Sequence, residues 1–167
     1  LLDIHASRTQ GSKPFIICES NAKEIVKYLP VELVVSGFDK IEPGGTDYYM
    51  NSIGKIGICV ECGYFKDPKS TLIIEKSILA FLGARGHIIN GLKQQKQSYI
   101  QMYDLYVTET NNFTLEKQFN DFEKILRGQT IGIDGDKKIR VGKRSIILFA
   151  RNRKQIGAEA FLLGEKK

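Results

Sequence analysis

A histidine near the start of the chain, His5, has the surroundings expected of a metal ligand. It ends the largely apolar segment at residues 1–5, and such a segment is typical of a buried strand that delivers a side chain at its carboxyl end. A catalytic zinc ion normally takes three protein ligands, and imidazole is one of the common ones. The only other histidine is His87, and the sequence holds no His-x-x-Glu or His-Glu-x-x-His motif. His5 is therefore either a structural histidine or one ligand of a longer enzyme.

Glu61 could act as a general base. It follows the largely apolar residues 55–60, where a buried carboxylate has a raised pKa unless an opposite charge pairs with it. A carboxylate with a raised pKa is suited to taking a proton from water near neutral pH. The same position also fits a glutamate in an ordinary ion pair at the end of a strand, so both interpretations stay open.

Two loops have the composition of ligand-binding loops. The polar residues 6–13 follow the first apolar segment directly, and loops at the carboxyl ends of strands bind ligands in open α/β sheets. Gly44 and Gly45 could bring the backbone close to a ligand, and Thr46 could cap a short helix. Paired glycines also occur in many plain turns, so this second loop is the weaker candidate.

Cys59 and Cys62 form a Cys-x-x-Cys pair, a spacing found in redox and metal sites. Redox pairs of this kind usually lie at the start of a helix, whereas this pair follows an apolar, strand-like run. No second pair is present to complete a zinc site. We interpret the spacing as a structural coincidence.

The first 90 residues alternate apolar strand patterns with helical patterns, which predicts an α/β sheet with helices packed on it. Asn21, with Glu24 three residues later, forms a possible capping box for a helix that ends near Leu29. Asp67 and Pro68 begin a second helix that continues to Leu82 on an apolar stripe. We expect strands at residues 1–5, 14–18, 32–36 and 55–61.

The second part of the chain has a different pattern. Residues 93–97 are polar and linker-like, and short alternating segments rich in turns follow them. Asp134-Gly135-Asp136, between two such segments, predicts a hairpin. The expected domains are therefore an α/β domain at 1–92 and a small all-β domain at 93–167, with strands at residues 99–108, 130–133, 138–141, 145–149 and 158–162.

Composition limits the possible partners and compartments. The 167 residues are 42% hydrophobic and 26% charged, and no apolar stretch reaches the roughly 18 to 20 residues that span a bilayer. The net charge is +6, and eight of the 25 basic residues lie between Lys137 and Lys154, where Phe149 is the single aromatic residue. We expect no membrane and no nucleic-acid partner. Three cysteines, an odd number in strand-like surroundings, favour the reducing cytoplasm.

These segments, taken in order, resemble the zinc-dependent succinylglutamate desuccinylase and aspartoacylase family, a branch of the carboxypeptidase A-like metallohydrolases. Asp3-Ile4-His5 is similar to the family's Asp-Leu-His, whose histidine is the third zinc ligand. Val60-Glu61-Cys62-Gly63 resembles the segment that carries the family's catalytic glutamate. Residues 126–161 are similar to the family's C-terminal β domain. The family's His-x-x-Glu motif, which supplies the other two zinc ligands, is absent.

The resemblance implies part of a carboxypeptidase-like mixed sheet with flanking helices, followed by a small lipoyl-barrel-like β domain. It implies hydrolysis of the amide bond of an N-acyl amino acid or a related small substrate. His5 would bind Zn²⁺, with its second nitrogen oriented by Asp3 or by a backbone carbonyl, and Glu61 would be the catalytic acid and base. Weaker candidates for substrate contact are Arg8, Gly44, Gly45 and Thr46.

The chain begins in an apolar segment without Met, so we expect it to be the later portion of a longer enzyme, inactive and poor in metal by itself. A homo-oligomer is compatible with the resemblance. Two other functions stay open. The chain could be a scaffold that has kept the fold and lost the chemistry, or a carrier module in which Lys137, on an exposed turn, is modified.

Overall fold

The structure is a computed structural model that describes residues 1–89 and 91–167. The chain divides into two compact units, one formed by Leu1–Ile100 with Lys167 and the other by Gln101–Lys166. The assignment of separate functions to residues 1–92 and 93–167 stays a prediction.

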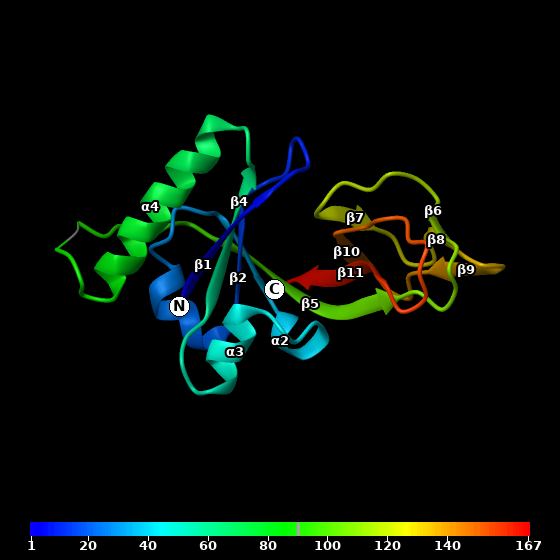
Figure 1. Ribbon diagram of the computed structural model, residues 1–167, viewed down its shortest axis with the longest axis horizontal. Helices are drawn as coiled ribbons and strands as arrows, with labels where there is room; N and C mark the ends of the chain where they lie inside the picture. The colour runs from blue at the N-terminus through cyan, green and yellow to red at the C-terminus, as the bar shows by residue number, and fades with distance from the viewer. Residues whose placement is uncertain (90) are drawn as a thin grey trace. The chain divides into compact units, whose positions relative to one another are not determined.

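Four strands of the first unit are neighbours in one sheet, and they run in both directions. The strand order is β1-β4-β2-β3. β1 pairs with β4 in parallel, β4 with β2 antiparallel, and β2 with β3 in parallel. The mixed sheet of an α/β fold, expected from the sequence, is therefore confirmed (Figure 1). The strands are β1 Leu2–Ser7, β2 Phe15–Cys18, β3 Leu33–Ser36 and β4 Ile58–Tyr64.

The pairing of β1 with β4 decides which side chains share a face of the sheet. Leu2 lies opposite Ile58, and Ile4 lies opposite Val60. All four belong to the hydrophobic core, in which Ile58 and Val60 are fully buried. Side chains alternate between the two faces of a strand, so the residues between these positions point away from that core. The pattern is irregular directly after His5, where β4 contains one extra residue and Gly63 has a φ of 90°.

β4 extends three residues further than the sequence predicted. The expected strand ended at Glu61, but the observed strand continues to Tyr64. Glu61 is therefore an interior residue of β4, paired on both sides, and its position at a strand end is corrected. The sequence prediction stopped early because a carboxylate and the following Cys-Gly resemble the end of a strand.

The helical segment after β2 lacks the side-chain cap that the sequence predicted. The segment after β2 forms the 3-10 helix η1 Ser20–Ala22 and the short helix α1 Lys23–Val26, neither with a side-chain cap. Asn21 does not cap, because its side-chain amide donates to Asn51 Oδ1 and to the carbonyl oxygen of Lys55. The helix also ends before Leu29. Two further short helices are α2 Phe38–Ile41 and α3 Thr46–Ser52.

The long helix α4 Pro68–Ala84 confirms the predicted amphipathic helix. The side chain of Asp67 accepts a hydrogen bond from the backbone N–H of Lys69, and Pro68 occupies the first turn, where its missing N–H costs nothing. Ala80 of α4 belongs to the same buried core as Ile58 and Val60 of β4, and Figure 1 shows α4 next to β4. Ile73, Ile74 and Phe81 pack against the same core.

The elements of the second unit are strands. β5 begins in the first unit and continues into the second, where the order is β5-β11-β10-β7, and β6, β8 and β9 form a separate sheet. The hairpin of β8 and β9 confirms the predicted turn, with Gly135 at a φ of 60°. A barrel-like form stays a prediction. The strands are β5 Ser98–Val107, β6 Phe113–Leu115, β7 Glu123–Ile125, β8 Thr130–Asp134, β9 Lys137–Arg140, β10 Ser145–Leu148 and β11 Glu159–Lys166.

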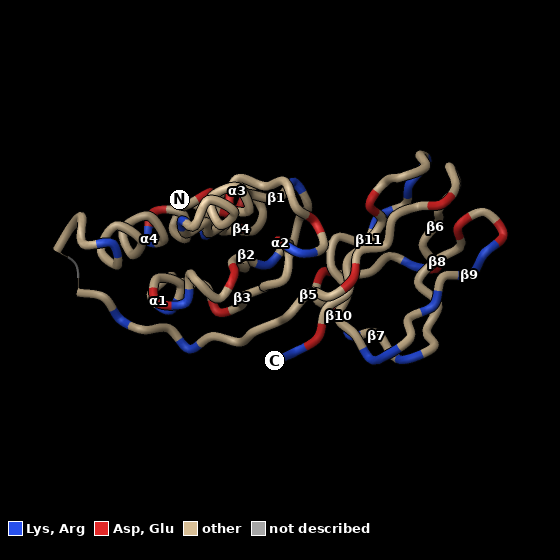
Figure 2. The backbone as a smooth tube through the Cα atoms, turned by 90° about the horizontal axis from the view of Figure 1, so that it is seen from below, with Lys and Arg blue, Asp and Glu red and all other residues tan. Residues whose placement is uncertain are grey.

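The basic residues of the second unit are interspersed with acidic ones, as the backbone coloured by charge shows (Figure 2). Lys137 forms an ion pair with Glu109, and Lys143 forms one with Glu165. The interspersed charges are those of a solvated protein face. None of the helices in the described residues is long and apolar enough to cross a membrane.

Candidate metal centre

His5 and Glu61 are partners on neighbouring strands. They occupy matching positions in the parallel pair of β1 and β4, and His5 Nδ1 lies 3.4 Å from Glu61 Oε1. The structure thus brings together the two residues that the sequence singled out 56 positions apart (61 − 5 = 56). The pairing follows from the apolar residue that precedes each of them, because Ile4 and Val60 hold the register by pointing into the core.

Asp3 lies on the other side of the imidazole. Its Oδ1 is 3.4 Å from His5 Nε2, so the two ring nitrogens of His5 face two different carboxylates. Asp3 Oδ2 accepts a hydrogen bond from the hydroxyl of Thr46 at the start of α3. That hydrogen bond, followed by the nearby imidazole, lowers the pKa of Asp3. A carboxylate behind a histidine is the usual partner that orients a metal-binding imidazole.

Cys59 is the third donor in this cluster. Ligand atoms of His5, Cys59 and Glu61 all lie within 4.8 Å of one another. Cys59 lies opposite Asp3 in the strand pairing, so it shares the face of His5 and Glu61. Burial, followed by the charge of Glu61, raises the pKa of its thiol. The two-residue alternation within the predicted strand 55–61 could have placed Cys59 on the face of Glu61, but the Cys-x-x-Cys spacing with Cys62 obscured this signal.

Cys62 points the other way. It is fully buried in the core with Val60, and its thiol donates to the carbonyl oxygen of Val60 at 3.6 Å. Burial raises the pKa of Cys62 to about 11. The Cys-x-x-Cys spacing therefore divides its two sulfurs between opposite faces of β4 and cannot act as a pair.

The donors of the cluster fit zinc. Zinc accepts imidazole nitrogen, thiolate sulfur and carboxylate oxygen. Two ligand atoms held tetrahedrally at roughly 2.0–2.1 Å from the ion lie about 3.4 Å apart, which is the separation of His5 Nδ1 and Glu61 Oε1. The His5 side chain is 55% exposed, whereas that of Glu61 is 17% exposed. The cluster is thus anchored on the sheet and open to solvent on the side of the imidazole.

The predicted substrate loops have different relations to this cluster. Thr46 is the first residue of α3 rather than its cap, which is Gly45, and its hydroxyl binds Asp3 instead. The predicted cap is therefore corrected, because Asp3 competes for the same hydroxyl. Gly44 has a φ of 131°, a conformation that favours glycine. Arg8 lies exposed in the loop after β1. Substrate contact at these residues stays a prediction.

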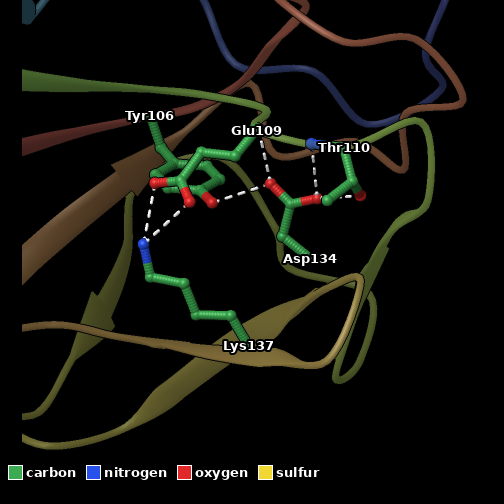
Figure 3. A network of polar contacts seen from close by, with 5 residues as sticks. All are labelled: Tyr106, Glu109, Thr110, Asp134 and Lys137. Atoms are coloured by element: carbon green, nitrogen blue, oxygen red, sulfur yellow. Dashed lines mark hydrogen bonds and ion pairs between the residues drawn. The ribbon is translucent and has the colours of Figure 1, made fainter.

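Lys137, the candidate for modification, belongs to a polar network at the hairpin of β8 and β9 (Figure 3). Its ammonium group donates to both carboxylate oxygens of Glu109, at 2.7 and 2.9 Å. Asp134, which is 2% exposed, accepts hydrogen bonds from Tyr106, from the backbone of Glu109 and from Thr110. Figure 3 shows Glu109 linking the two parts of this network, since its carboxylate binds Lys137 and its backbone N–H donates to Asp134.

A cavity of about 540 Å³ lies in the second unit, among residues of β7, β10 and β11. Four of its seven lining residues are charged, and it contains none of the residues predicted for the metal or the substrate. The lining residues are Lys124, Leu126, Arg144, Ser145, Ile146, Glu165 and Lys166.

No family model and no curated protein matches the sequence. Solved structures do match the fold. Succinylglutamate desuccinylase from Vibrio parahaemolyticus has a TM-score of 0.78 at 15% identity, with 99% of this chain and 53% of that chain covered. The Vibrio cholerae desuccinylase also has a TM-score of 0.78, at 16% identity, with 99% and 52% covered.

A third similar structure is the product-bound ectoine utilization protein EutE (DoeB) from Ruegeria pomeroyi. Its TM-score is 0.68 at 15% identity, with 98% of this chain and 57% of that chain covered. The chain thus spans somewhat more than half the length of the structures it matches. The resemblance to the succinylglutamate desuccinylase and aspartoacylase family is confirmed at the level of the fold, which these structures share with the chain over almost its entire length.

Proposed function

We propose that this chain is part of a zinc-dependent deacylase that hydrolyses the amide bond of an N-acyl amino acid or a related small substrate. The observation that carries the proposal is the approach of His5 Nδ1 to Glu61 Oε1 at 3.4 Å, on paired strands. A metal-ligating imidazole beside a carboxylate that accepts protons is the arrangement used by zinc hydrolases. The fold shared with desuccinylase structures supports the same class of reaction.

Each residue of the cluster has a distinct task in this reaction. When bound, zinc supplies Lewis acidity that polarises the scissile carbonyl and makes water more acidic. His5 holds the ion through one nitrogen, and Asp3 fixes the ring by accepting a hydrogen bond from the other. Glu61 takes a proton from the attacking water and passes it to the leaving amine. Gly44, Gly45, Thr46 and Arg8 are proposed to contact the substrate.

The reaction needs ligands that this sequence does not contain. The family pattern takes two of its three zinc ligands from a His-x-x-Glu motif, and the chain has none. We therefore propose that the chain alone is inactive and that activity requires the motif from a further segment. A cytoplasmic setting, a small-molecule substrate and a possible homo-oligomer complete the proposal, with no nucleic-acid or membrane partner.

The proposal is tested by measuring zinc content and hydrolysis of a panel of N-acyl amino acids. Both are measured on this chain and on a longer chain in which an upstream segment supplies His-x-x-Glu. We expect turnover only in the longer chain. Turnover by the present chain alone would contradict the requirement for a further segment, and its absence from both would contradict the deacylase.

Glu61→Gln in the longer chain separates an enzyme from a scaffold that has lost its chemistry. The substitution keeps the shape of the side chain but removes its ability to accept a proton, so kcat should fall on the order of 100-fold or more. Unchanged hydrolysis would leave Glu61 as a structural ion-pairing residue. A mass increase on Lys137 in the native protein would instead support a carrier module.

A further inference from the structure

We propose that Cys59 joins His5 and Glu61 to form a three-donor metal site that lies wholly within this chain. The ion would be zinc or a similar borderline-soft divalent metal, bound without ligands from any other segment. The inference rests on the proposed site but not on the proposed hydrolysis. It replaces the expectation of a metal-poor chain, which counted a single imidazole as the only donor.

The first argument is the number and kind of donor atoms. One nitrogen, one sulfur and one oxygen converge within 4.8 Å of one another on a single face of the sheet. Zinc normally takes three protein ligands and one water in an open site, and all three donor types are among those it uses. Thiolate sulfur disfavours magnesium and calcium, which take oxygen ligands. The donor set therefore selects for zinc and its chemical relatives.

The second argument is geometry. His5 Nδ1 and Glu61 Oε1 are already at the separation of two ligands on tetrahedral zinc. A sulfur ligand at about 2.3 Å from the ion would lie roughly 3.5 Å from each of the other two donors. A side-chain rotation of Cys59 would close the remaining distance from 4.8 Å or less. The backbone of the three residues needs no displacement, because paired strands hold all of them.

The third argument is the orientation of the imidazole. His5 Nε2 faces Asp3 Oδ1, and Asp3 is in turn held by the hydroxyl of Thr46. This arrangement leaves Nδ1, the nitrogen near Glu61, for the ion. The exposed side of His5 provides room for water as the fourth ligand. On binding, the thiol of Cys59 releases its proton to solvent and coordinates as the thiolate.

The three-donor site also explains why a metal-loaded chain would be inactive. With Glu61 bound to the ion and Asp3 facing His5 Nε2, neither carboxylate is left to take a proton from water. The ligands of an upstream His-x-x-Glu motif would displace Glu61 and free it to act as the base. Metal binding and catalysis are thus separate properties of the same cluster.

Cobalt(II) titration of this chain tests the proposal, because cobalt replaces zinc and a cobalt–thiolate bond gives an intense charge-transfer band in the near ultraviolet. We expect the band at one equivalent of cobalt. Cys59→Ser should abolish it and lower zinc affinity at least about tenfold, since even the loss of a residue that only orients a ligand costs 10- to 100-fold. Cys62→Ser is the matched control, on the same strand with its sulfur in the core, and it should keep the band.

Absence of the band in the unsubstituted chain would overturn the proposal, and so would a band that persists in Cys59→Ser. Circular dichroism confirms that each variant is folded. If Cys59→Ser does not fold, reaction of the native thiols with iodoacetamide replaces it, and zinc should slow alkylation of Cys59 selectively, whereas equal rates would overturn the proposal. Hydrolysis by the longer chain distinguishes the two proposals. A cobalt band without turnover would overturn only the proposed deacylase activity. Turnover without a cobalt band would overturn only the three-donor site.

Discussion

Four polar residues of two adjacent strands make up the candidate centre, and their side chains share one face because of strand alternation. Asp3 and His5 are two residues apart on β1, and Cys59 and Glu61 are two apart on β4. His5 and Glu61 could be predicted from residue type and local hydrophobicity. Cys59 could not, because its approach to His5 depends on the register between β4 and β1, which the neighbouring apolar residues in the core set.

Asp3 is predicted to control metal affinity through the orientation of His5. Asp3→Asn removes the charge behind His5 Nε2 and weakens the acceptor that holds the ring, so zinc affinity should fall roughly 10- to 100-fold. Competition with a chromophoric chelator measures the affinity. Asp104→Asn makes the same charge change at an exposed position of β5 and should leave the affinity unchanged. Equal affinities for the two variants would exclude an orienting role for Asp3.

At the scale of elements, the long helix and most strands followed from the sequence, while the caps of short helices did not. Asp67 caps α4 at its predicted start, because the backbone N–H that donates to its carboxylate is only two residues away. Asn21 and Thr46 have equally suitable side chains, but each binds a residue at least 30 positions distant. Local rules therefore held where the partner was local. They did not hold where tertiary contacts offered the same side chain another partner.

The hairpin of β8 and β9 is predicted to lose stability in acid through Asp134. Burial acts to raise the pKa of Asp134, but hydrogen bonds from Thr110, Glu109 and Tyr106 outweigh it and keep the pKa below its ordinary 3.8. A group with a lowered folded pKa contributes stability that is present above its unfolded pKa and is lost as the pH falls through the folded value. The contribution should therefore be complete above about pH 5, decline as the pH falls below about 4, and be lost only below the folded pKa.

The substitution Asp134→Asn tests the direction of this pH dependence. The variant should be less stable by about 1–3 kcal/mol at pH 7, because the buried hydrogen-bond donors lose the charged carboxylate that accepts from them. Its stability should also change less than that of the native chain between pH 5 and pH 2, as measured by urea unfolding of the second unit. Asp136→Asn, at the exposed turn of the same hairpin, provides the control. Identical pH dependence in all three proteins would show that Asp134 does not carry the effect.

At the scale of the whole molecule, the fold is recognisable although little sequence is shared. Identities near 15% accompany TM-scores up to 0.78, because the alternation of apolar positions can be kept while the residues themselves change. The α/β character of the first unit and the positions of most of its strands were thus accessible from patterns, whereas the order of the strands in the sheet was not. The short strands β6 and β7, each of three residues, escaped prediction because three residues give too little alternation to distinguish a strand from a loop.

Metal binding is predicted to stabilise one unit and not the other. A ligand that binds only the folded state at 100 times its dissociation constant adds about 2.7 kcal/mol. All three donors lie in Leu1–Ile100, so amide hydrogen exchange in β1 and β4 should slow when zinc is added. Exchange in β8 and β9 of the second unit serves as the internal reference and should not change. Uniform slowing throughout the chain would contradict binding at this cluster.

The parallel pairing of His5 with Glu61 also has a kinetic consequence. Parallel strands require a crossover, and here 55 residues separate the two partners along the chain (61 − 5 − 1 = 55). Contacts between such distant residues form late, because the closure of a long loop must precede them. The cluster therefore arises only when β1 meets β4, and a bound cobalt ion would report that moment of folding. The rate at which its spectrum appears during refolding would measure how fast β1 pairs with β4.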